Sequence, residues 1–101
     1  MSITVEFHGP IARIILSGGI DYSTQEEIRT ANSQALAAEQ VKEIHVNFAE
    51  VTFLDSSAIR ALLMLQRAAE GEGKSLVLLN CNVFIRETFE IGGFDKLFTI
   101  R

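Results

Sequence analysis

The stretch Val51-Thr52-Phe53-Leu54-Asp55-Ser56-Ser57-Ala58-Ile59 marks the point where the chain changes from strand to helix. The apolar residues that follow it recur every three or four positions, which predicts an α-helix from Asp55-Ser56-Ser57 to Gly71-Glu72-Gly73. Residues 42–48 alternate between polar and apolar types, which predicts a strand, and we expect residues 49–54 to connect this strand to the helix. A strand followed directly by a helix indicates an α/β domain.

The flanking sequence continues this alternation. Residues 3–8 and 11–16 carry apolar patterns on either side of Gly9-Pro10, which predicts a hairpin that breaks at Ser17-Gly18-Gly19. The order β-β-α-β-α-β-α-β predicts an α/β fold with a mixed sheet of four to five strands and helices packed on it, because helical crossovers favour parallel pairing. The remaining expected elements are a helix, a covered strand, a short helix and a closing strand, at residues 24–38, 75–79, 83–91 and 97–100.

The composition fits one small globular domain over residues 1–101. Nine basic against thirteen acidic residues give a net charge of −4, whereas a nucleic-acid binder needs a clustered cationic surface, so we expect no nucleic-acid partner. The single cysteine, Cys81, excludes an internal disulfide and any site that needs several cysteines. The N-terminus lacks a signal-peptide pattern, and no apolar run approaches the ~20 residues that span a bilayer, so we expect a cytoplasmic protein without a membrane span.

The segment Asp55-Ser56-Ser57 is the main candidate for function. It follows a strand and precedes a helix, and ligands of open α/β sheets bind where the strands end. Either Asp55 or Ser56 can cap the helix, because a side-chain oxygen at its start accepts a hydrogen bond from a free backbone N–H group. Alternatively, one serine is a phosphoacceptor, whose modification adds roughly −1.5 to −2 charges at the start of the helix. The residues themselves leave both interpretations open.

Other reactive residues form no recognisable active site. A serine hydrolase needs a base beside its nucleophile, and neither His8 nor His45 stands in a catalytic motif. Asp21 and Asp55 alone would make a weak metal site. The segment Gly71-Glu72-Gly73-Lys74-Ser75 follows a helix and precedes a strand, the reverse of a phosphate-binding loop. We therefore expect no catalytic residue, no metal and no cofactor.

Two further features have alternative interpretations. Cys81 follows a strand and has no charged neighbour that would activate a thiol, so we expect a small inert side chain rather than a redox site. Arg60 and Arg67 lie seven residues apart on the predicted helix and therefore project from a similar face. That face is either solvated or meets an acidic partner.

The chain resembles, over essentially its whole length, the STAS domain of bacterial anti-sigma factor antagonists. The likeness is carried by residues 51–59, by Leu16-Ser17-Gly18-Gly19-Ile20-Asp21, which is similar to the family's Gly-Glu-Leu-Asp corner, and by residues 89–98, which are similar to its last helix and closing strand. Gly19 departs from the family, which usually has an acidic residue there, and Ala58 stands where glycine is common. The resemblance implies a single STAS domain.

The resemblance also implies a phosphorylation-controlled partner switch. A serine kinase of the GHKL ATPase type would phosphorylate the serine after the aspartate, which is Ser56 here, and a PP2C-like phosphatase would reverse the reaction. The unmodified protein would bind and sequester the kinase or anti-sigma factor, and phosphorylation would release it, so the chain is a substrate and not an enzyme. The alternative is a STAS interaction subunit of a larger assembly, stressosome-like or transporter-associated, without a phosphorylation cycle.

The expected docking site for the partner surrounds Ser56. Asp21 either caps the first helix or, as the resemblance implies, lies on the rim of the docking surface. Because Ser23 and Thr24 are better placed to cap a helix that begins at Gln25, we favour docking and expect Asp21 to be free. We expect a monomer, and the regulated output is a sigma factor or another pathway, such as biofilm or secretion control. The residues expected at the docking site are Asp21, Tyr22, Asp55, Ser57, Ala58 and Ile59.

Overall fold

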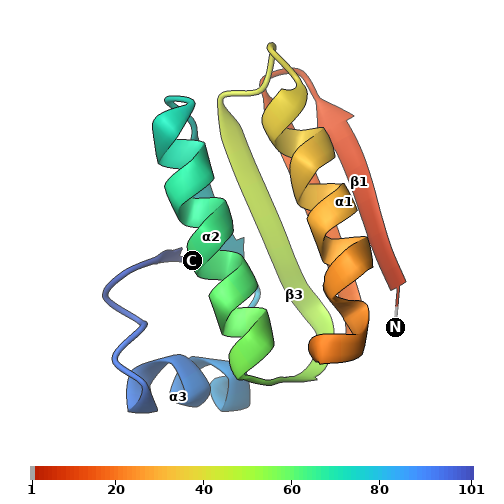
Figure 1. Cartoon of the computed structure of the whole chain (residues 1–101). Coiled ribbons are helices and arrows are strands. Elements are labelled where there is room, and N and C mark those ends of the chain that lie inside the picture. Colours follow the sequence, from red (N-terminus) through yellow and green to blue (C-terminus); the bar gives the residue numbers. More distant parts are fainter. Residues whose placement is uncertain (1) are drawn as a thin grey trace.

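Strands and helices alternate along the chain (Figure 1). The computed structural model describes residues 2–101, and Met1, the first residue of the expected domain, lies outside the described residues. No helix within this described range has both the length and the apolar character needed to cross a membrane. In chain order the elements are β1 (Ser2–His8), β2 (Ile11–Ile20), the 3₁₀ turn η1 (Tyr22–Thr24), α1 (Gln25–Ala37), β3 (Glu43–Leu54), α2 (Ser56–Gly71), β4 (Ser75–Leu79), α3 (Val83–Ile91) and β5 (Thr99–Ile100).

The strands form one mixed sheet in the order β1-β2-β3-β4-β5. β1 and β2 pair antiparallel around Gly9-Pro10, as the alternating pattern predicts. β3 pairs parallel with both β2 and β4, and β4 pairs parallel with β5, because each connection crosses over through a helix. The closing strand is shorter than expected, Thr99–Ile100 in place of residues 97–100. The structure confirms the α/β fold class, the order of elements and the mixed sheet.

Two expected strand ends are wrong. β2 does not break at Ser17-Gly18-Gly19 but continues to Ile20, and residues 49–54 belong to β3 rather than to a connection. These two segments pair with each other through two irregularities in register. Gly18 adopts a left-handed φ of 82°, which a residue with a side chain rarely adopts. Pairing between the strands therefore outweighs the local turn signals.

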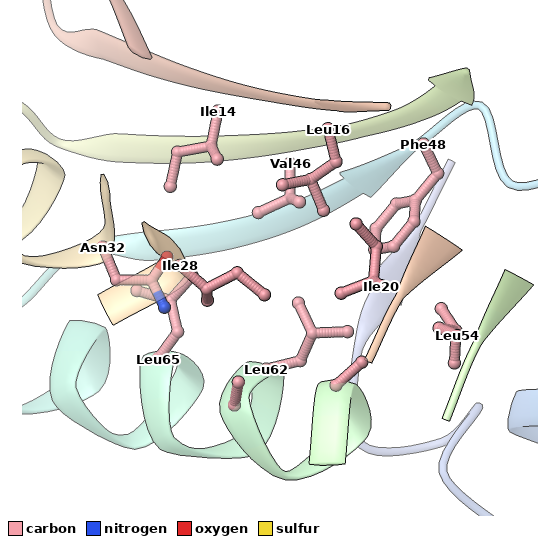
Figure 2. Close-up of a pocket in the computed structure, with 12 residues that line it drawn as sticks. Ile14, Leu16, Ile20, Ile28, Asn32, Val46, Phe48, Leu54, Leu62 and Leu65 are labelled. Carbon is pink, nitrogen blue, oxygen red and sulfur yellow. The ribbon is translucent and has the colours of Figure 1, made fainter. Parts of the chain in front are cut away.

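The apolar core lies between the sheet and the helices α1 and α2, which pack on one of its faces (Figure 1). Alternate side chains of the strands point into this layer, and Ile14 and Val46 are each only 2% exposed. Leu62 and Leu65 of α2 meet them from the other side (Figure 2). Burying one such side chain contributes about 1.5–3 kcal/mol. The space left among them is about 20 Å³, room for one water-sized molecule, and its lining includes the polar Asn32.

The helix α3 lies at the end of the molecule where α2 begins (Figure 1). Phe89 of α3 is fully buried, and its ring meets Phe48 of β3 edge to face with centroids 6.3 Å apart. The same ring lies 5.7 Å from that of Phe98, just before β5. Aromatic pairs of this kind add about 0.5–1.5 kcal/mol beyond their burial. The three rings thus attach the C-terminal part of the chain to the sheet.

Lys74 joins the turn after α2 to the end of α1. α2 ends at Gly71, as the glycine-rich segment predicts, and Gly73 adopts a left-handed φ of 71°. The Lys74 side chain turns inward and is only 9% exposed. Its Nζ donates to the backbone oxygens of Leu36 at 2.6 Å and Ala38 at 2.9 Å. A cation at the carboxyl end of a helix is favourable, and here it supplies a donor to the Leu36 carbonyl that the helix leaves free, so this lysine is a structural residue.

Replacing Lys74 with methionine is expected to lower the free energy of unfolding by about 1–3 kcal/mol, because the carbonyl group of Leu36 loses its donor, whereas that of Ala38 still accepts from the N–H of Val41. Methionine keeps most of the apolar stem, so the change isolates the ammonium group. Lys42→Met, at an exposed position, is the matched control and should alter the stability by less than ~0.5 kcal/mol. Chemical denaturation of the three proteins measures both effects, and equal stabilities would show that the Lys74 hydrogen bonds contribute nothing.

Candidate functional site

The carboxyl ends of β2 and β3 meet at one edge of the sheet, and an acidic residue follows each strand. The last register partners are Ile20 and Leu54. The N–H of Asp55 then donates to the carbonyl oxygen of Ile20 at 3.1 Å, which extends the pairing by one step. Asp21 and Asp55 therefore leave neighbouring strands at the same edge, where the sequence predicts the functional loop.

Asp55 caps α2 and holds Ser57 in place. Its backbone is extended, with φ −105° and ψ −175°. Its Oδ1 accepts hydrogen bonds from the N–H of Ala58 at 3.1 Å and from Oγ of Ser57 at 2.5 Å. The Ser57 hydroxyl is the main reason why the pKa of Asp55 lies below its ordinary value of 3.8; desolvation acts in the opposite sense, and backbone N–H groups add to the lowering. Of the two possible caps, the structure selects Asp55 rather than Ser56.

This arrangement leaves Ser56 free. It is the first residue of α2, its side chain is exposed, and it takes part in none of the side-chain hydrogen bonds formed within residues 2–101. Ser57, in contrast, is half-buried, donates to Asp55 and accepts a long hydrogen bond of 3.5 Å from Nε2 of Gln25. Of the two serines, Ser56 is therefore the more exposed one, and the one whose hydroxyl is not already hydrogen-bonded.

Asp21 caps the 3₁₀ turn, and the expectation that it is free is wrong. Its Oδ1 accepts hydrogen bonds from the N–H of Ser23 at 2.9 Å and from Oγ of Ser23 at 2.5 Å. Thr24 makes no capping bond to α1 with its side chain; its hydroxyl donates to the carbonyl oxygen of Asp21 at 2.7 Å. The reason is that η1 places the first helical residue at Tyr22 instead of Gln25, so the cap moves back with it.

A hollow of about 810 Å³ opens beside Ser56, between the first turns of α1 and α2. Ser56, Arg60 and Met64 follow one another at intervals of four residues, so they share the outer face of α2, and all three line the hollow. Tyr22 and Met64 add apolar surface, since they are 80% and 62% exposed. Sequence reasoning missed Met64, although its spacing from Ser56 was a usable signal. It also missed Arg29, which reaches the hollow only because α1 packs beside α2.

The residues predicted at the docking site divide into an exposed and a buried group. Tyr22 and Ser57 line the hollow together with Ser56. Ala58 and Ile59 are only 3% and 7% exposed, so their side chains pack into the core beneath the loop and leave little surface for a partner. Asp21 and Asp55, which are half-buried, fix the backbone between the two groups through their capping bonds.

Neither histidine can serve as a base for these serines. His45 lies near the start of β3 and contacts Glu43 at 2.9 Å. At a rise of about 3.3 Å per residue, the strand carries Asp55 about 30 Å away from it. His8 contacts Glu6 at 3.2 Å and lies at the hairpin turn, at the opposite end of β2 from Asp21. Within residues 2–101, no three His, Cys, Asp or Glu side chains are grouped as metal ligands.

Cys81 is a buried residue of the core, which agrees with the small inert side chain expected there. It is 8% exposed, and burial raises the pKa of its thiol to about 11, with Arg86 acting weakly in the opposite direction. The thiol is therefore protonated at neutral pH, and a protonated thiol is a poor nucleophile.

Gly19 and Phe53 form a contact across β2 and β3 that depends on the missing side chain of glycine. They are register partners, and a Cβ at position 19 would lie 2.2 Å from Cε1 of Phe53. The ring therefore covers the backbone of Gly19 and is itself 45% exposed. An acidic side chain at position 19, usual in the family that the sequence resembles, would displace the ring. The position of the Phe53 ring therefore depends on glycine at position 19.

Comparison with known proteins finds the same domain along almost the whole chain. Residues 3–100 match the family described as “Mlab, STAS domain”. A STAS-domain containing protein of Pseudomonas aeruginosa (strain UCBPP-PA14) is 32% identical over 87 residues, which make up 86% of this chain and 84% of the relative. An anti-sigma F factor antagonist of Paenibacillus polymyxa is 22% identical over 100 residues, 99% of this chain and 86% of the relative.

Solved structures agree with this similarity. The unphosphorylated form of the anti-sigma factor antagonist SpoIIAA has a TM-score of 0.77 at 27% identity, covering 99% of this chain and 87% of its own. The phosphorylated form of the Bacillus cell fate determinant SpoIIAA has a TM-score of 0.76 at 27% identity, covering 99% and 91%. The fold that the sequence resemblance implies is confirmed.

Gly19→Ala is expected to destabilise the protein by about 0.5–2 kcal/mol, because the Phe53 ring must leave its place. In a Phe53→Ala background the same change is expected to stabilise it by about 0.5–1 kcal/mol, since alanine loses less conformational entropy than glycine in a strand. Urea denaturation of the four proteins in this cycle measures the coupling. An effect of the same sign in both backgrounds would refute the contact.

Ser57→Ala is expected to raise the pKa of Asp55 toward 3.8, because the hydroxyl that stabilises the carboxylate is lost. Ser56→Ala is the matched control and should leave the pKa unchanged. The carboxyl carbon shift in an NMR pH titration measures both. Since folding lowers this pKa, the ionised group stabilises the fold above about pH 4, and that stability is lost as the pH falls through the lowered value. Equal rises in the two variants would show that Ser56 also binds the carboxylate.

Proposed function

The chain belongs to the STAS domain family, and on that basis we propose that it is a phosphorylation-controlled partner-switching regulator of the anti-sigma factor antagonist type. In its unmodified form it binds a GHKL-type serine kinase or anti-sigma factor. Phosphorylation of Ser56 releases this partner, and a PP2C-like phosphatase returns the chain to its binding form. The protein acts as a substrate and a switch rather than as an enzyme, and it does so as a cytoplasmic monomer.

The exposed hydroxyl of Ser56 is the observation that carries this proposal. Asp55 and Ser57 bind each other, so the loop is held rigid while the serine between them stays accessible. A kinase needs an accessible hydroxyl, because the attacking oxygen must lie in line with the γ-phosphoryl group. The similar protein SpoIIAA has structures in both an unphosphorylated and a phosphorylated form, which supports the same modification here.

The surface around Ser56 has the composition of a protein interface. Aromatic, methionine and arginine side chains are enriched at interfaces, and the hollow presents one tyrosine, one methionine and two arginines beside the serine. We therefore propose a docking surface that keeps the exposed members of the predicted set and adds two residues from α2. It consists of Tyr22, Ser56, Ser57, Arg60 and Met64, which line the hollow, with the half-buried Asp21 at its rim and Asp55, Ala58 and Ile59 supporting it from beneath.

A phosphate at this position is sufficient to switch binding. It adds roughly −1.5 to −2 charges at the centre of the docking surface, where a bound partner would exclude water. A hundredfold loss of affinity needs only about 2.7 kcal/mol. The helix itself tolerates the charge, because its N-terminus carries a partial positive charge. The modification can therefore release the partner while the fold stays intact.

A second candidate function uses the same surface without a phosphate. As an interaction subunit of a stressosome-like or transporter-associated assembly, the chain would keep its partner bound permanently. The exposed Tyr22 and Met64 suit permanent contact as well as transient contact. The two functions differ in whether a kinase modifies Ser56.

Incubation with ATP and a GHKL-type serine kinase from the same genome is expected to label Ser56 and not Ser57. Phosphopeptide mapping of the wild type, Ser56→Ala and Ser57→Ala measures this. Label that persists on Ser56→Ala and vanishes on Ser57→Ala would show that Ser57, and not Ser56, is the modified serine. A chain that stays unlabelled, and that co-purifies with transporter or sensor subunits, would favour the second function.

Ser56→Ala is expected to bind the kinase permanently and to melt within about 2 °C of the wild type, because the exposed hydroxyl makes no hydrogen bond to lose. Ser56→Asp should bind the kinase more weakly at an equally unchanged melting temperature. Titration calorimetry and thermal melts measure both properties. Binding of Ser56→Asp as tight as that of the wild type would argue against an electrostatic switch.

A further inference from the structure

Arg60 lies one helical turn after Ser56 on the same face of α2. The two residues are separated by about 6 Å along the helix axis, and side chains at this spacing are neighbours. Both line the hollow between α1 and α2. Arg60 is exposed and takes part in none of the ion pairs formed within the described range, residues 2–101.

The other charged groups at the hollow are already engaged. Arg29 of α1 binds Glu26 through Nη1 at 3.2 Å. In the loops beside the hollow, the carboxylates of Asp21 and Asp55 accept hydrogen bonds from the residues that follow them. Arg60 is therefore the cation at this surface that can take a new anionic partner without breaking an existing pair.

We propose that Arg60 binds the phosphate once Ser56 is phosphorylated, and thereby positions it over the first turn of α2. This inference rests on the proposed function, since it requires a phosphate on Ser56. A guanidinium group presents paired N–H donors that match the oxygens of a phosphate, and such charge-assisted pairs are among the stronger hydrogen bonds in proteins. The order also favours the pair, because an anion that precedes a cation by four residues agrees with the helix dipole.

The pair gives phosphorylation a second effect on the docking surface. In the unmodified protein, the Arg60 guanidinium is open to a carboxylate of the partner. In the phosphorylated protein, the phosphate occupies it. The modification therefore adds a negative charge and also withdraws a positive one, and both changes weaken the attraction to an acidic partner.

Arg67 is the matched control on the same helix. It is exposed like Arg60 and projects from a similar face, but it follows Ser56 by eleven residues. This spacing corresponds to about 17 Å along the axis, beyond the Debye length of about 8 Å at physiological salt. Removing its charge changes the net charge of the protein as much as removing that of Arg60, without affecting a phosphate on Ser56.

The test uses the full chain with phosphoserine inserted at position 56 during translation, so that no kinase is needed. A ³¹P NMR pH titration gives the second pKa of the phosphate. Replacing Arg60 with glutamine is expected to raise this pKa by about 0.3 or more, which is a twofold change in proton affinity. Arg60→Lys should restore part of the lowering, and Arg67→Gln should match the unsubstituted phosphoprotein. High salt should reduce the difference between Arg60 and its glutamine variant.

Two results would overturn the proposal. One is a phosphate pKa that is the same in Arg60→Gln as in the unsubstituted phosphoprotein. The other is a rise in this pKa that is as large in Arg67→Gln as in Arg60→Gln, which would indicate a general effect of net charge. Circular dichroism checks that every variant is folded, as expected for exposed positions. A chain that no kinase phosphorylates would refute the proposed function but would leave this measurement standing, so the two failures are distinguishable.

Discussion

The parallel pairing of β2 with β3 is the interaction on which the functional edge depends. The two strands stay paired through two irregularities in register until Ile20 and Leu54. Without this pairing, Asp21 and Asp55 would leave the sheet at unrelated places, because 33 residues lie between them along the chain. The strand ends also set the starting points of η1 and α2, so the hollow between the first turns of α1 and α2 follows from the sheet.

At that edge, two adjacent serines have different roles because Asp55 binds only one of them. Its Oδ1 accepts both the N–H of Ala58 and the hydroxyl of Ser57, which fixes the loop. Ser56 comes just before these two donors in the chain, and its exposed side chain lines the hollow. The cap of α2 therefore depends on Asp55 and Ser57, whereas the proposed switch depends on Ser56. Phosphorylation of Ser56 thus leaves the capping hydrogen bonds intact.

Local patterns in the sequence predicted most elements, since the apolar spacing of α2 and the alternation of β1 are properties of single segments. They failed where distant segments decide the outcome. The sequence around Ser17-Gly18-Gly19 is typical of a turn, yet these residues pair with β3 and stay in the strand. Asp21 becomes a cap because a 3₁₀ turn begins directly after it. The site was predicted at Ser56, whereas the contacts of Lys74 and of Phe53 with Gly19 depend on packing between elements that no single segment encodes.

The central claim is that the charge on Ser56 controls partner binding at this edge. Its most direct test is the affinity of the GHKL-type kinase for two forms of the same chain, unmodified and fully phosphorylated on Ser56, measured by titration calorimetry at one ionic strength. The account predicts that the phosphorylated form binds at least a hundredfold more weakly, which corresponds to about 2.7 kcal/mol. Equal affinity for the two forms would contradict it.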